Sequence, residues 1–125
     1  MKAFLFIIIF ALSLLNCKQK RSSDPKIVLT EYYEHIKNGE FEEAKAMSDD
    51  KNKKRIEEEW EIPTKREGLE KFKEYYSKFH QSIGEPVIEG KYAIVPLYER
   101  GTDRVEHQRL ERDGDTWIVL PVVLR

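Results

Sequence analysis

Hydrophobic and polar positions follow a helical period between residues 24 and 84 and an alternating period from residue 87 onward. The first helical segment carries apolar residues at intervals of three and four: Leu29, Tyr32, Tyr33 and Ile36. This spacing predicts one apolar helix face. The helix is expected to begin at Asp24-Pro25, a capping residue and a proline suited to the first turn, and to end at Asn38-Gly39.

Residues 40–48 keep the helical spacing and predict a short second helix, which forms an αα-hairpin with the first. Residues 49–61 are dominated by charge, with Ile56 and Trp60 four apart on one side. We expect a solvated helix docked by these two side chains. Its acidic residues follow its basic ones, an order that opposes the helix dipole, so the helix is expected to be marginal or frayed.

Pro63 is expected to end this charged segment, and a stronger helix is expected to follow. Thr64 and Glu67 have the spacing of a capping box, in which each side chain satisfies a backbone N–H group at the helix start. An aromatic-rich stripe continues along the helix: Leu69, Phe72, Tyr76 and Phe79. The helix is expected to end before Gly84, with this stripe buried against the rest of the domain.

The alternating part of the chain predicts an antiparallel sheet. Its β segments are residues 87–89, 92–98, 104–112 and 116–124. Asp113-Gly114 is a strong hairpin signal between the last two. The final segment is apolar on both faces and should be central or covered, with its ladder interrupted at Pro121, while Pro96 predicts an edge position or a bulge in its own strand.

The segment 104–112 departs from strict alternation, because its two aliphatic residues, Val105 and Leu110, fall on opposite faces. A bulge between them would return both to the core. Alternatively, Val105, His107 and Arg109 form one face that is turned toward a polar cavity. The sequence leaves both interpretations open.

A strongly apolar leader with a basic start precedes the predicted domain. Residues 1–16 are too short for a helix across a bilayer, since a span of roughly 30 Å needs about 20 residues. Leu14-Leu15-Asn16-Cys17 resembles the lipobox of bacterial lipoproteins, relaxed as in spirochaetes because Asn16 stands where Gly, Ala or Ser is usual. The resemblance implies cleavage between Asn16 and Cys17 and a lipid on Cys17. The alternative is an ordinary membrane anchor or a buried helix.

Residues 17–23 are predicted to be a polar tether between this lipid and a single domain at residues 24–125. The tether contains three cations, Lys18, Lys20 and Arg21. They either contact anionic headgroups or only keep the tether soluble. The lipid would anchor the protein in a bacterial cell envelope, at the inner membrane, the outer membrane or the cell surface.

Charge and cysteine content exclude several function classes. The chain of 125 residues has a formal net charge of −1, which removal of Lys2 with the leader makes more negative, so nucleic acid is not an expected partner. The single cysteine excludes a disulfide framework and a cysteine-built metal site. No histidine pair or His/Asp cluster has the spacing of metal ligands, and we expect neither a metal nor a cofactor.

Two motifs and the order of the predicted elements resemble the nuclear transport factor two-like superfamily, in particular uncharacterised domains of small bacterial lipoproteins. The motifs are Tyr32-Tyr33 with residues 38–44, and residues 110–119. The resemblance implies a cone-shaped α+β fold, in which N-terminal helices pack on a curved antiparallel sheet with Trp117 under the helices. It also implies that two sheets can pair in a homodimer. The superfamily includes isomerases, dehydratases, ligand carriers and interaction modules, so the fold selects no single activity.

The function we predict is that of a non-catalytic, lipid-anchored envelope protein whose domain binds a small apolar ligand or an envelope protein. The anchored position and the supply of tyrosines motivate this prediction. The residues expected to line a cavity in the cone are Tyr33, Tyr76, Tyr98 and His107. One alternative is a structural or surface-interaction lipoprotein whose charged faces meet host or envelope macromolecules.

A further alternative is an isomerase- or dehydratase-like enzyme that uses the cone cavity, with a buried carboxylate or histidine as its base. The histidines of the chain are His35, His80 and His107. The sequence places no acid beside any of them, and a surface position accounts for each. We therefore expect no catalytic residues, although an inward-facing His107 beside a carboxylate would favour the enzyme.

Overall fold

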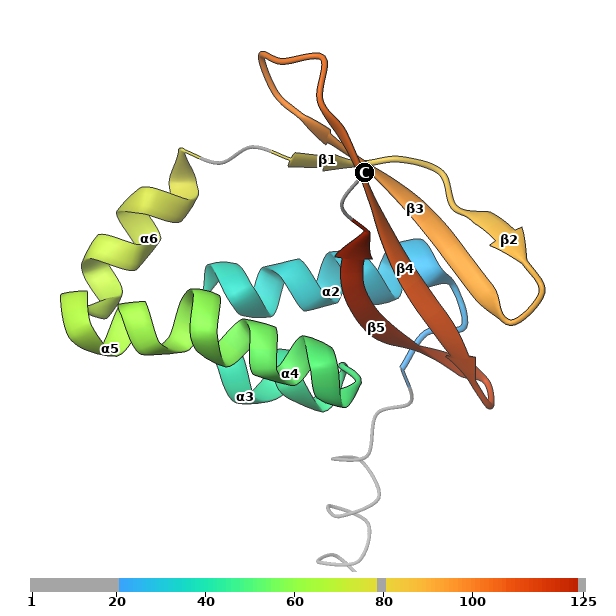
Figure 1. Ribbon diagram of the computed structural model, residues 1–125, viewed down its shortest axis with the longest axis horizontal. Coiled ribbons are helices and arrows are strands. Elements are labelled where there is room, and N and C mark those ends of the chain that lie inside the picture. Colours follow the sequence, from blue (N-terminus) through green and yellow to red (C-terminus); the bar gives the residue numbers. More distant parts are fainter. Residues whose placement is uncertain (1–20, 79–80, 124–125) are drawn as a thin grey trace, which may run out of the picture.

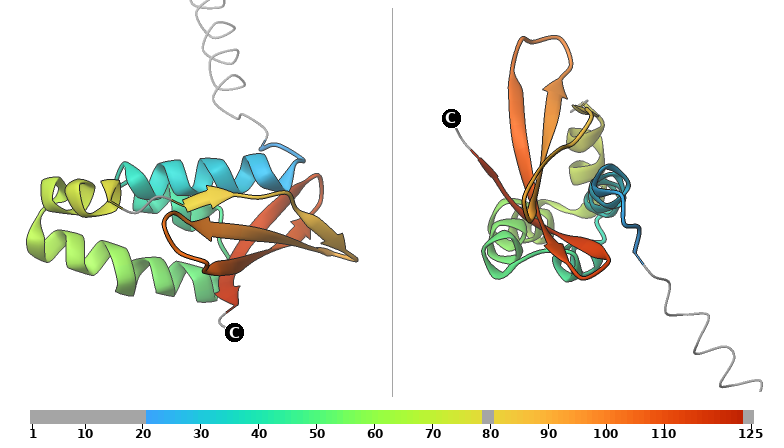
Figure 2. Two further views of the ribbon diagram at one scale, coloured as in Figure 1. Left: turned by 90° about the horizontal axis from the view of Figure 1, so that it is seen from above. Right: turned by 90° about the vertical axis from the view of Figure 1, so that its right-hand side faces the viewer.

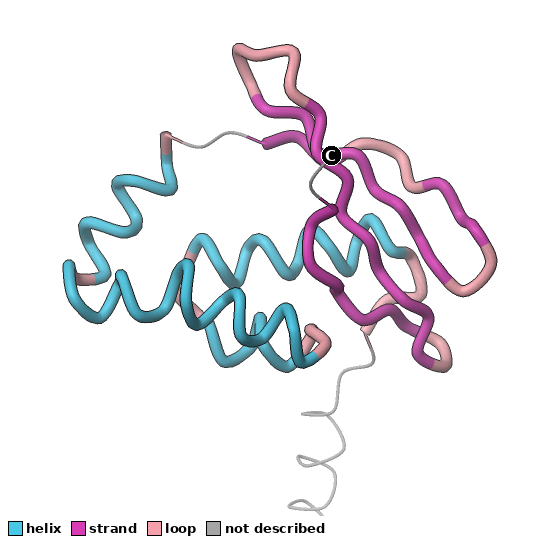
Figure 3. The backbone as a smooth tube through the Cα atoms, in the orientation of Figure 1, coloured by secondary structure: helices cyan, strands magenta, loops and turns pink. Residues whose placement is uncertain are grey.

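The computed structural model describes residues 21–78 and 81–123. The predicted leader, Asn16 and Cys17 lie outside the described residues. The chain forms helices first and a curved, antiparallel five-stranded sheet second, which is an α+β fold (Figure 1). The helices gather on one side of the molecule and the strands on the other (Figure 3).

In the described residues, all the helices precede all the strands along the chain. The helices are α2 (Pro25–Lys37), α3 (Phe41–Ala46), α4 (Asp50–Ile56), the π-helix η1 (Glu57–Glu61), α5 (Ile62–Glu67) and α6 (Leu69–Ser77). The strands are β1 (Gln81–Ile83), β2 (Val87–Glu89), β3 (Tyr92–Glu99), β4 (Val105–Asp113) and β5 (Thr116–Val123).

Helix α2 forms as the sequence predicts. The Asp24 side chain caps it by accepting a hydrogen bond from the Lys26 N–H group, and Pro25 occupies the first turn. The helix ends at Asn38, and Gly39 then adopts a φ of 74°, a left-handed conformation that favours glycine. The buried face of α2 consists of Val28, Leu29, Tyr32 and Ile36. Helix α3 packs beside α2, which confirms the predicted hairpin.

Residues 50–67 form one continuous helical arm, made of α4, η1 and α5, so the break predicted at Pro63 is wrong. The π-helical turn η1 widens the helix just before Pro63, which relieves the clash between a proline ring and the carbonyl group one turn earlier. The predicted capping box is also wrong, because the Thr64 hydroxyl donates a hydrogen bond to the Trp60 carbonyl oxygen at 2.6 Å. The arm ends at Gly68, whose φ is 98°, and α6 starts there in a new direction (Figure 1).

The strand order is β1-β3-β4-β5, with β2 also paired to β3. Strand β1 is not predicted by the sequence pattern: α6 ends at Ser77, and β1 pairs with β3 through Ile83 and Leu97. Pro96 lies in this inner strand where the partner of β3 changes from β2 to β1, and its carbonyl oxygen accepts a hydrogen bond from the Gly84 N–H group at 2.8 Å. Because the N and O atoms of a residue point to the same neighbouring strand, the missing N–H of Pro96 removes no hydrogen bond to β4.

A bulge lies between β4 and β5, but its extra residue is in β5, so the bulge predicted between Val105 and Leu110 of β4 is wrong. The pairs on either side of it are Gln108–Val122 and Leu110–Val119. Between these pairs β5 contains two residues, Leu120 and Pro121, where β4 contains only Arg109. The bulge does not return Val105 to the core: Val105 is 43% exposed, and Gln108 is buried instead.

The outer edge of β5 is covered, as the apolar final segment predicts. The chain after α3 runs along this edge in a short parallel bridge. The Val119 N–H group donates to the Met47 carbonyl oxygen at 2.8 Å, and the Asp49 N–H group donates to the Val119 carbonyl oxygen at 3.1 Å. These bonds satisfy the edge of the sheet and tie the helical hairpin to it.

The hydrophobic core lies between the inner face of the sheet, the α2–α3 hairpin and the arm. The sheet contributes Ala93, Val95, Leu97, Leu110, Trp117 and Val119, and the helical part contributes α2 residues together with Phe41, Ala44, Met47, Ile56 and Phe72. Asn52 is buried beside this core and is satisfied there, since its amide group donates to the Tyr32 hydroxyl at 3.1 Å and to the Ser48 hydroxyl at 2.9 Å.

A largely buried ion pair holds the arm against the helical hairpin. The Lys45 Nζ atom of α3 lies 2.8 Å from the Glu61 Oε1 atom of η1, and the two side chains are only 17% and 13% exposed. The hydrogen bond from Lys45 lowers the pKa of the Glu61 carboxyl below 4.5, and the same bond raises the pKa of the Lys45 ammonium above 10.5. The folded protein therefore favours the charged form of both groups.

Glu61→Gln is expected to lower the free energy of unfolding by about 1–3 kcal/mol at neutral pH, between the values of exposed and buried pairs. Glu61 has a lowered pKa, so its contribution is present above the unfolded value of 4.5 and is lost as pH falls through the folded value. Lys45 has a raised pKa, so its contribution is present below 10.5 and is lost as pH rises through the folded value. Urea unfolding of the wild type and the variant at a series of pH values measures the free energy of unfolding, and it shows where the stabilisation is lost at low pH and at high pH.

Glu58→Gln is the matched control, because Glu58 belongs to the same arm and lies 3.9 Å from Lys54 with both side chains mostly exposed. It is expected to change stability by less than about 0.5 kcal/mol. Equal destabilisation by the two substitutions would contradict a special role of the Lys45–Glu61 pair.

Candidate functional site

A pocket of about 730 Å³ lies where α2, the arm and α6 meet one end of the sheet. We call it the helix–sheet pocket. Its aromatic lining consists of Tyr33, Trp60 and Tyr76, and its charged lining consists of Lys26, Glu34, Lys37, Arg55 and Glu106. The sheet contributes further lining at Gln81, Ile83 and Val122. Both the volume and the mixture of rings with a few polar groups are typical of small-molecule sites.

The floor of this pocket is fixed by a buried polar link between α2 and the sheet. Gln108 is 1% exposed and accepts a hydrogen bond from the Tyr33 hydroxyl at 2.7 Å. The Gln108 amide group donates to the Leu120 carbonyl oxygen, in the bulge of β5. Both polar ends of the glutamine are therefore satisfied, and the Tyr33 ring is held in one position.

Burial raises the pKa of Tyr33 well above its ordinary value of 10.0, and the neighbouring Tyr32 and Tyr76 raise it further. Burial also raises the pKa of Tyr76. Both phenols consequently stay neutral in the physiological range. They can donate hydrogen bonds and present apolar ring surface, but they are unsuited to act as bases.

An aromatic cluster forms the wall between the arm and α6. The Trp60 ring contacts the Tyr76 ring at 5.7 Å and the Phe72 ring at 5.9 Å between centroids, both in edge-to-face geometry. Phe72 in turn packs against Phe41 of α3 at 5.4 Å. The cluster connects the pocket wall to the core, so the wall is supported from behind.

The local sequence explains why Trp60 occupies this position. Trp60 belongs to the π-helical turn before Pro63, and the wider turn changes the direction of its side chain relative to a regular α-helix. Its carbonyl oxygen is satisfied by the Thr64 hydroxyl. The sequence pattern indicates Trp60 only as a residue that docks a solvated helix, and the structure adds its role in the pocket wall.

Two pocket cations already have acidic partners. The Lys26 Nζ atom lies 2.7 Å from the Glu85 Oε1 atom, and the Arg55 Nε atom lies 3.0 Å from the Glu59 Oε2 atom. These pairs reduce the excess positive charge at the rim. The pocket therefore favours a ligand with an apolar body and a polar group rather than a multiply charged anion.

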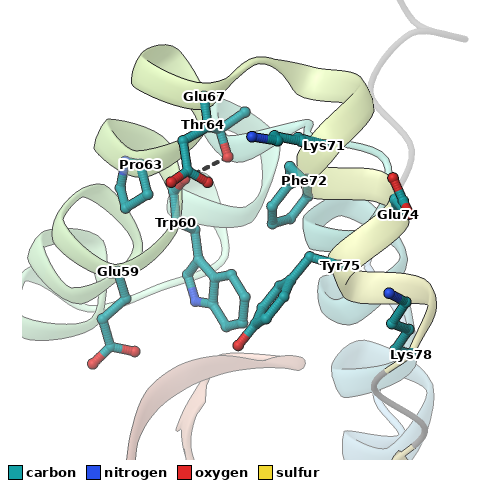
Figure 4. Close-up of a pocket in the computed structure, with 10 residues that line it drawn as sticks. All are labelled: Glu59, Trp60, Pro63, Thr64, Glu67, Lys71, Phe72, Glu74, Tyr75 and Lys78. Atoms are coloured by element: carbon teal, nitrogen blue, oxygen red, sulfur yellow. Dashed lines mark hydrogen bonds between the residues drawn. The ribbon is translucent and has the colours of Figure 1, made fainter.

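A second pocket of about 610 Å³ lies on the other side of Trp60, between the arm and α6. Figure 4 shows the rings of Trp60, Phe72 and Tyr75 turned toward one another there, with Lys71 and Glu67 at the rim. This site is bounded by helices alone, whereas the helix–sheet pocket adjoins the buried Tyr33–Gln108 hydrogen bond that joins α2 to the sheet. We therefore regard the helix–sheet pocket as the candidate site.

The structure separates the four residues predicted to line a cavity. Tyr33 and Tyr76 line the helix–sheet pocket, whereas Tyr98 and His107 are not among its lining residues. Tyr98 pairs with Val105 on β4, and both are more than 40% exposed on the outer face of the sheet. His107 pairs with Pro96 two positions from Val105, so it shares this outer face. The placement of Tyr98 and His107 in the cavity is thus corrected.

The same alternation turns Glu106 and Gln108 toward the inner face, between the outward-facing residues of β4. These two polar residues are missed as site residues by the sequence pattern. The signal that could have identified them is their period of two with Leu110, which extends the buried face of the strand to polar side chains.

The two described histidines, His35 and His107, form no acid–base site with the pocket. His35 Nδ1 lies 3.1 Å from Glu40 Oε1, a carboxylate neighbour that sequence reasoning could not place, but the pair is partly exposed and lies outside the pocket lining. His107 faces away from Glu106, and His80 lies outside the described residues. The inward-facing His107 beside a carboxylate, which would favour an enzyme, is not the arrangement found.

In the described parts of the chain, no group of three or more His, Cys, Asp or Glu residues is arranged to hold a metal ion. No helix within residues 21–78 and 81–123 has the length and apolar character needed to cross a membrane. Comparison of the chain with known protein families, curated proteins and solved structures gives no match. The function must therefore be argued from the site itself.

Proposed function

We propose that this protein is a non-catalytic, lipid-anchored binding protein of a bacterial cell envelope. Its helix–sheet pocket takes a small amphiphilic ligand, with an apolar body between Tyr33, Trp60 and Tyr76 and a polar group toward the charged rim. The observation that carries the proposal is the pocket of about 730 Å³ whose aromatic floor is fixed by the Tyr33–Gln108 hydrogen bond. A floor held in this way loses little side-chain freedom when a ligand binds.

The proposed fold family is the nuclear transport factor two-like superfamily. Support comes from the order of the elements, helices followed by a curved antiparallel sheet, and from a pocket enclosed between the two. Trp117 is buried on the inner face of β5, which is consistent with this proposal.

The proposed anchor is a lipid on Cys17 after cleavage at Asn16. Support comes from the sequence, in which a short apolar leader ends in a relaxed lipobox. A lipid contributes about 0.8 kcal/mol for each buried methylene, and more than one acyl chain gives stable membrane attachment without a spanning helix.

The absence of catalysis is proposed from the chemistry of the pocket lining. Its tyrosines have raised pKa values, its cations Lys26 and Arg55 are paired with carboxylates, and no histidine is among the described residues that line it. Such groups can bind an amphiphile through ring contacts and hydrogen bonds, and neutral phenols of this kind are unsuited to act as general bases.

A second candidate function, self-association, is favoured by the outer face of the sheet. Val87, Tyr98 and Val105 are 43–56% exposed there, while Tyr92 lies under the Arg109 guanidinium at 5.5 Å from the ring centroid. Pairing with a second copy of the chain would remove the exposed apolar side chains from water.

Cys17→Ser is expected to move the protein from the membrane fraction to the soluble fraction, because the substituted residue cannot carry a thioether-linked lipid. Fractionation and immunoblotting measure this, and globomycin should cause the unprocessed precursor to accumulate in the wild type. Unchanged membrane retention of the Cys17→Ser protein would contradict the proposed anchor.

Tyr76→Ala is expected to weaken binding of 1-anilinonaphthalene-8-sulfonate, a probe with aromatic rings and one anionic group, by roughly fivefold, since one aromatic contact contributes about 1 kcal/mol. Fluorescence titration measures the affinity. Tyr98→Ala is the matched control, because it removes the same side chain from the outer face, and its affinity should equal that of the wild type.

Ser77→Phe tests the same site without removing a ring from the cluster. Ser77 is exposed and lines the pocket, so a larger side chain should occupy part of the volume and weaken binding of the probe. Equal affinities of the Tyr76→Ala, Ser77→Phe and Tyr98→Ala proteins, each with a wild-type circular dichroism spectrum, would contradict binding in the helix–sheet pocket.

Val105→Glu is expected to abolish any dimer that forms through the outer face of the sheet, because it places a charge opposite the exposed Tyr98. Sedimentation velocity of the wild type and the variant measures this. Glu99→Lys, at the end of β3, is a control for charge alone. A wild type that is monomeric at high micromolar concentration would contradict the dimer and would leave ligand binding unaffected.

A further inference from the structure

The first described residues of the chain are not a free tether but are bound to the start of β5. The Ser22 carbonyl oxygen accepts a hydrogen bond from the Thr116 hydroxyl at 3.0 Å. The next carbonyl oxygen, that of Ser23, accepts a hydrogen bond from the Trp117 Nε1 atom at 2.9 Å. Two consecutive carbonyl groups of the tether are therefore held by two consecutive side chains of the strand.

A third contact reaches back to the helical hairpin. The Arg21 Nη2 atom donates a hydrogen bond to the Ala46 carbonyl oxygen at 2.7 Å, at the end of α3. This carbonyl belongs to the last turn of a helix, where backbone acceptors have no partner within the helix. We call the contacts of residues 21–23 with α3 and β5 the clamp.

The indole group explains why the clamp is part of the fold. Trp117 is 2% exposed, and its ring is covered by the Arg112 guanidinium at 4.6 Å from the ring centroid. A buried indole N–H group requires an acceptor, and the tether carbonyl of Ser23 supplies it. Release of the tether would leave this buried donor unpaired.

The clamp leaves a very short free segment before the proposed lipid. Only three residues separate Cys17 from Arg21 in the sequence, so a fully extended chain places their Cα atoms at most about 14 Å apart. The clamped end of the domain is thereby kept close to the surface of the bilayer. This step rests on the lipid anchor of the proposed function.

We infer that the clamp fixes the orientation of the domain on the membrane, with the start of β5 toward the headgroups and the turn between β3 and β4 toward the aqueous phase. Strand β5 begins at the clamp with Thr116 and reaches the pocket at Val122, six residues and about 20 Å later. Strand β4 runs back from the pocket at Glu106 to the same hairpin. The clamp thus lies at one end of this hairpin and the pocket residues Glu106 and Val122 lie toward the other, while the pocket itself extends along α2 back to Lys26.

The figures show the same separation. The described chain begins at the bottom of Figure 1, whereas the orange turn between β3 and β4 lies at the top. The right-hand view of Figure 2 again places the start of the chain below and α6 above.

Orientation is tested with the full lipidated chain in vesicles that contain a headgroup-labelled quencher lipid. A fluorophore is attached either at the clamped end, through Asp115→Cys, or at the far end, through Thr102→Cys. The dye at position 115 is expected to be quenched at least about threefold more strongly than the dye at position 102. The reason is that the two ends of a hairpin of this length differ by about 20 Å or more in height above the bilayer surface. Equal quenching at the two positions would overturn the orientation.

Thr116→Val together with Trp117→Phe removes both side-chain donors of the clamp; Val keeps the shape of Thr, and Phe keeps a smaller aromatic ring in the core. In this double variant, the ratio of quenching at position 115 to quenching at position 102 should fall toward one. Trypsin should cleave after Arg21 roughly tenfold faster, because protection of a segment from proteolysis follows its local stability. Thr30→Val, on the exposed face of α2, is the control and should change neither quantity. A quenching difference or a cleavage rate that is unaltered by release would overturn the clamp.

The two proposals fail in different ways. If the wild-type chain does not float with the vesicles, the lipid anchor is wrong, and the orientation falls with it. Trypsin cleavage after Arg21, measured in detergent, tests the clamp whether or not the chain floats with the vesicles. If the chain floats and Arg21 is protected but both dyes are equally quenched, the anchor and the clamp stand, and the orientation is wrong.

Discussion

The buried side chain of Gln108 is the constraint on which the arrangement of helices and sheet depends. An amide group in this position costs free energy unless both of its ends are bonded. The bulge of β5 provides the Leu120 carbonyl oxygen for one end, and α2 provides the Tyr33 hydroxyl for the other. The link connects α2, β4 and β5 at one place. The position of the pocket floor follows from it, and α6 and the arm close the pocket around that floor.

The two ends of β5 have different tasks in the proposed protein. At its start, the strand holds the tether through Thr116 and Trp117, and at its end it contributes Val122 to the pocket. Its central part is joined to the chain after α3 by two backbone hydrogen bonds at Val119. The same strand therefore carries the attachment, the core and part of the binding site. A displacement of β5 would move the tether contacts, the core and the pocket together, so we regard β5 as the element that positions the rest of the domain.

Local signals were sufficient for much of the fold. The cap at Asp24, the stop at Gly39 and the hairpin at Asp113-Gly114 act over a few residues, and the elements they delimit are as predicted. The error at Pro63 has a different origin. A proline alone predicts a break in the helix, but the π-helical turn accommodates Pro63 within it. The packing of Trp60 and the Lys45–Glu61 ion pair then favour a continuous helical arm. These contacts join residues far apart in sequence, so no local pattern contains them.

The sequence by itself determined the class of the fold, the order of its elements and the aromatic character of the site, because the periods of hydrophobic residues and the turn residues are local properties. Only the tertiary structure decided which residues meet. It placed Tyr33 and Tyr76 in one pocket and left Tyr98 and His107 on the opposite face of the sheet. The physical reason is that the face of a strand residue depends on its register with neighbouring strands. The β3–β4 register is regular, and burial of Gln108 on the inner face of β4 leaves His107 and the Tyr98–Val105 pair on the outer face.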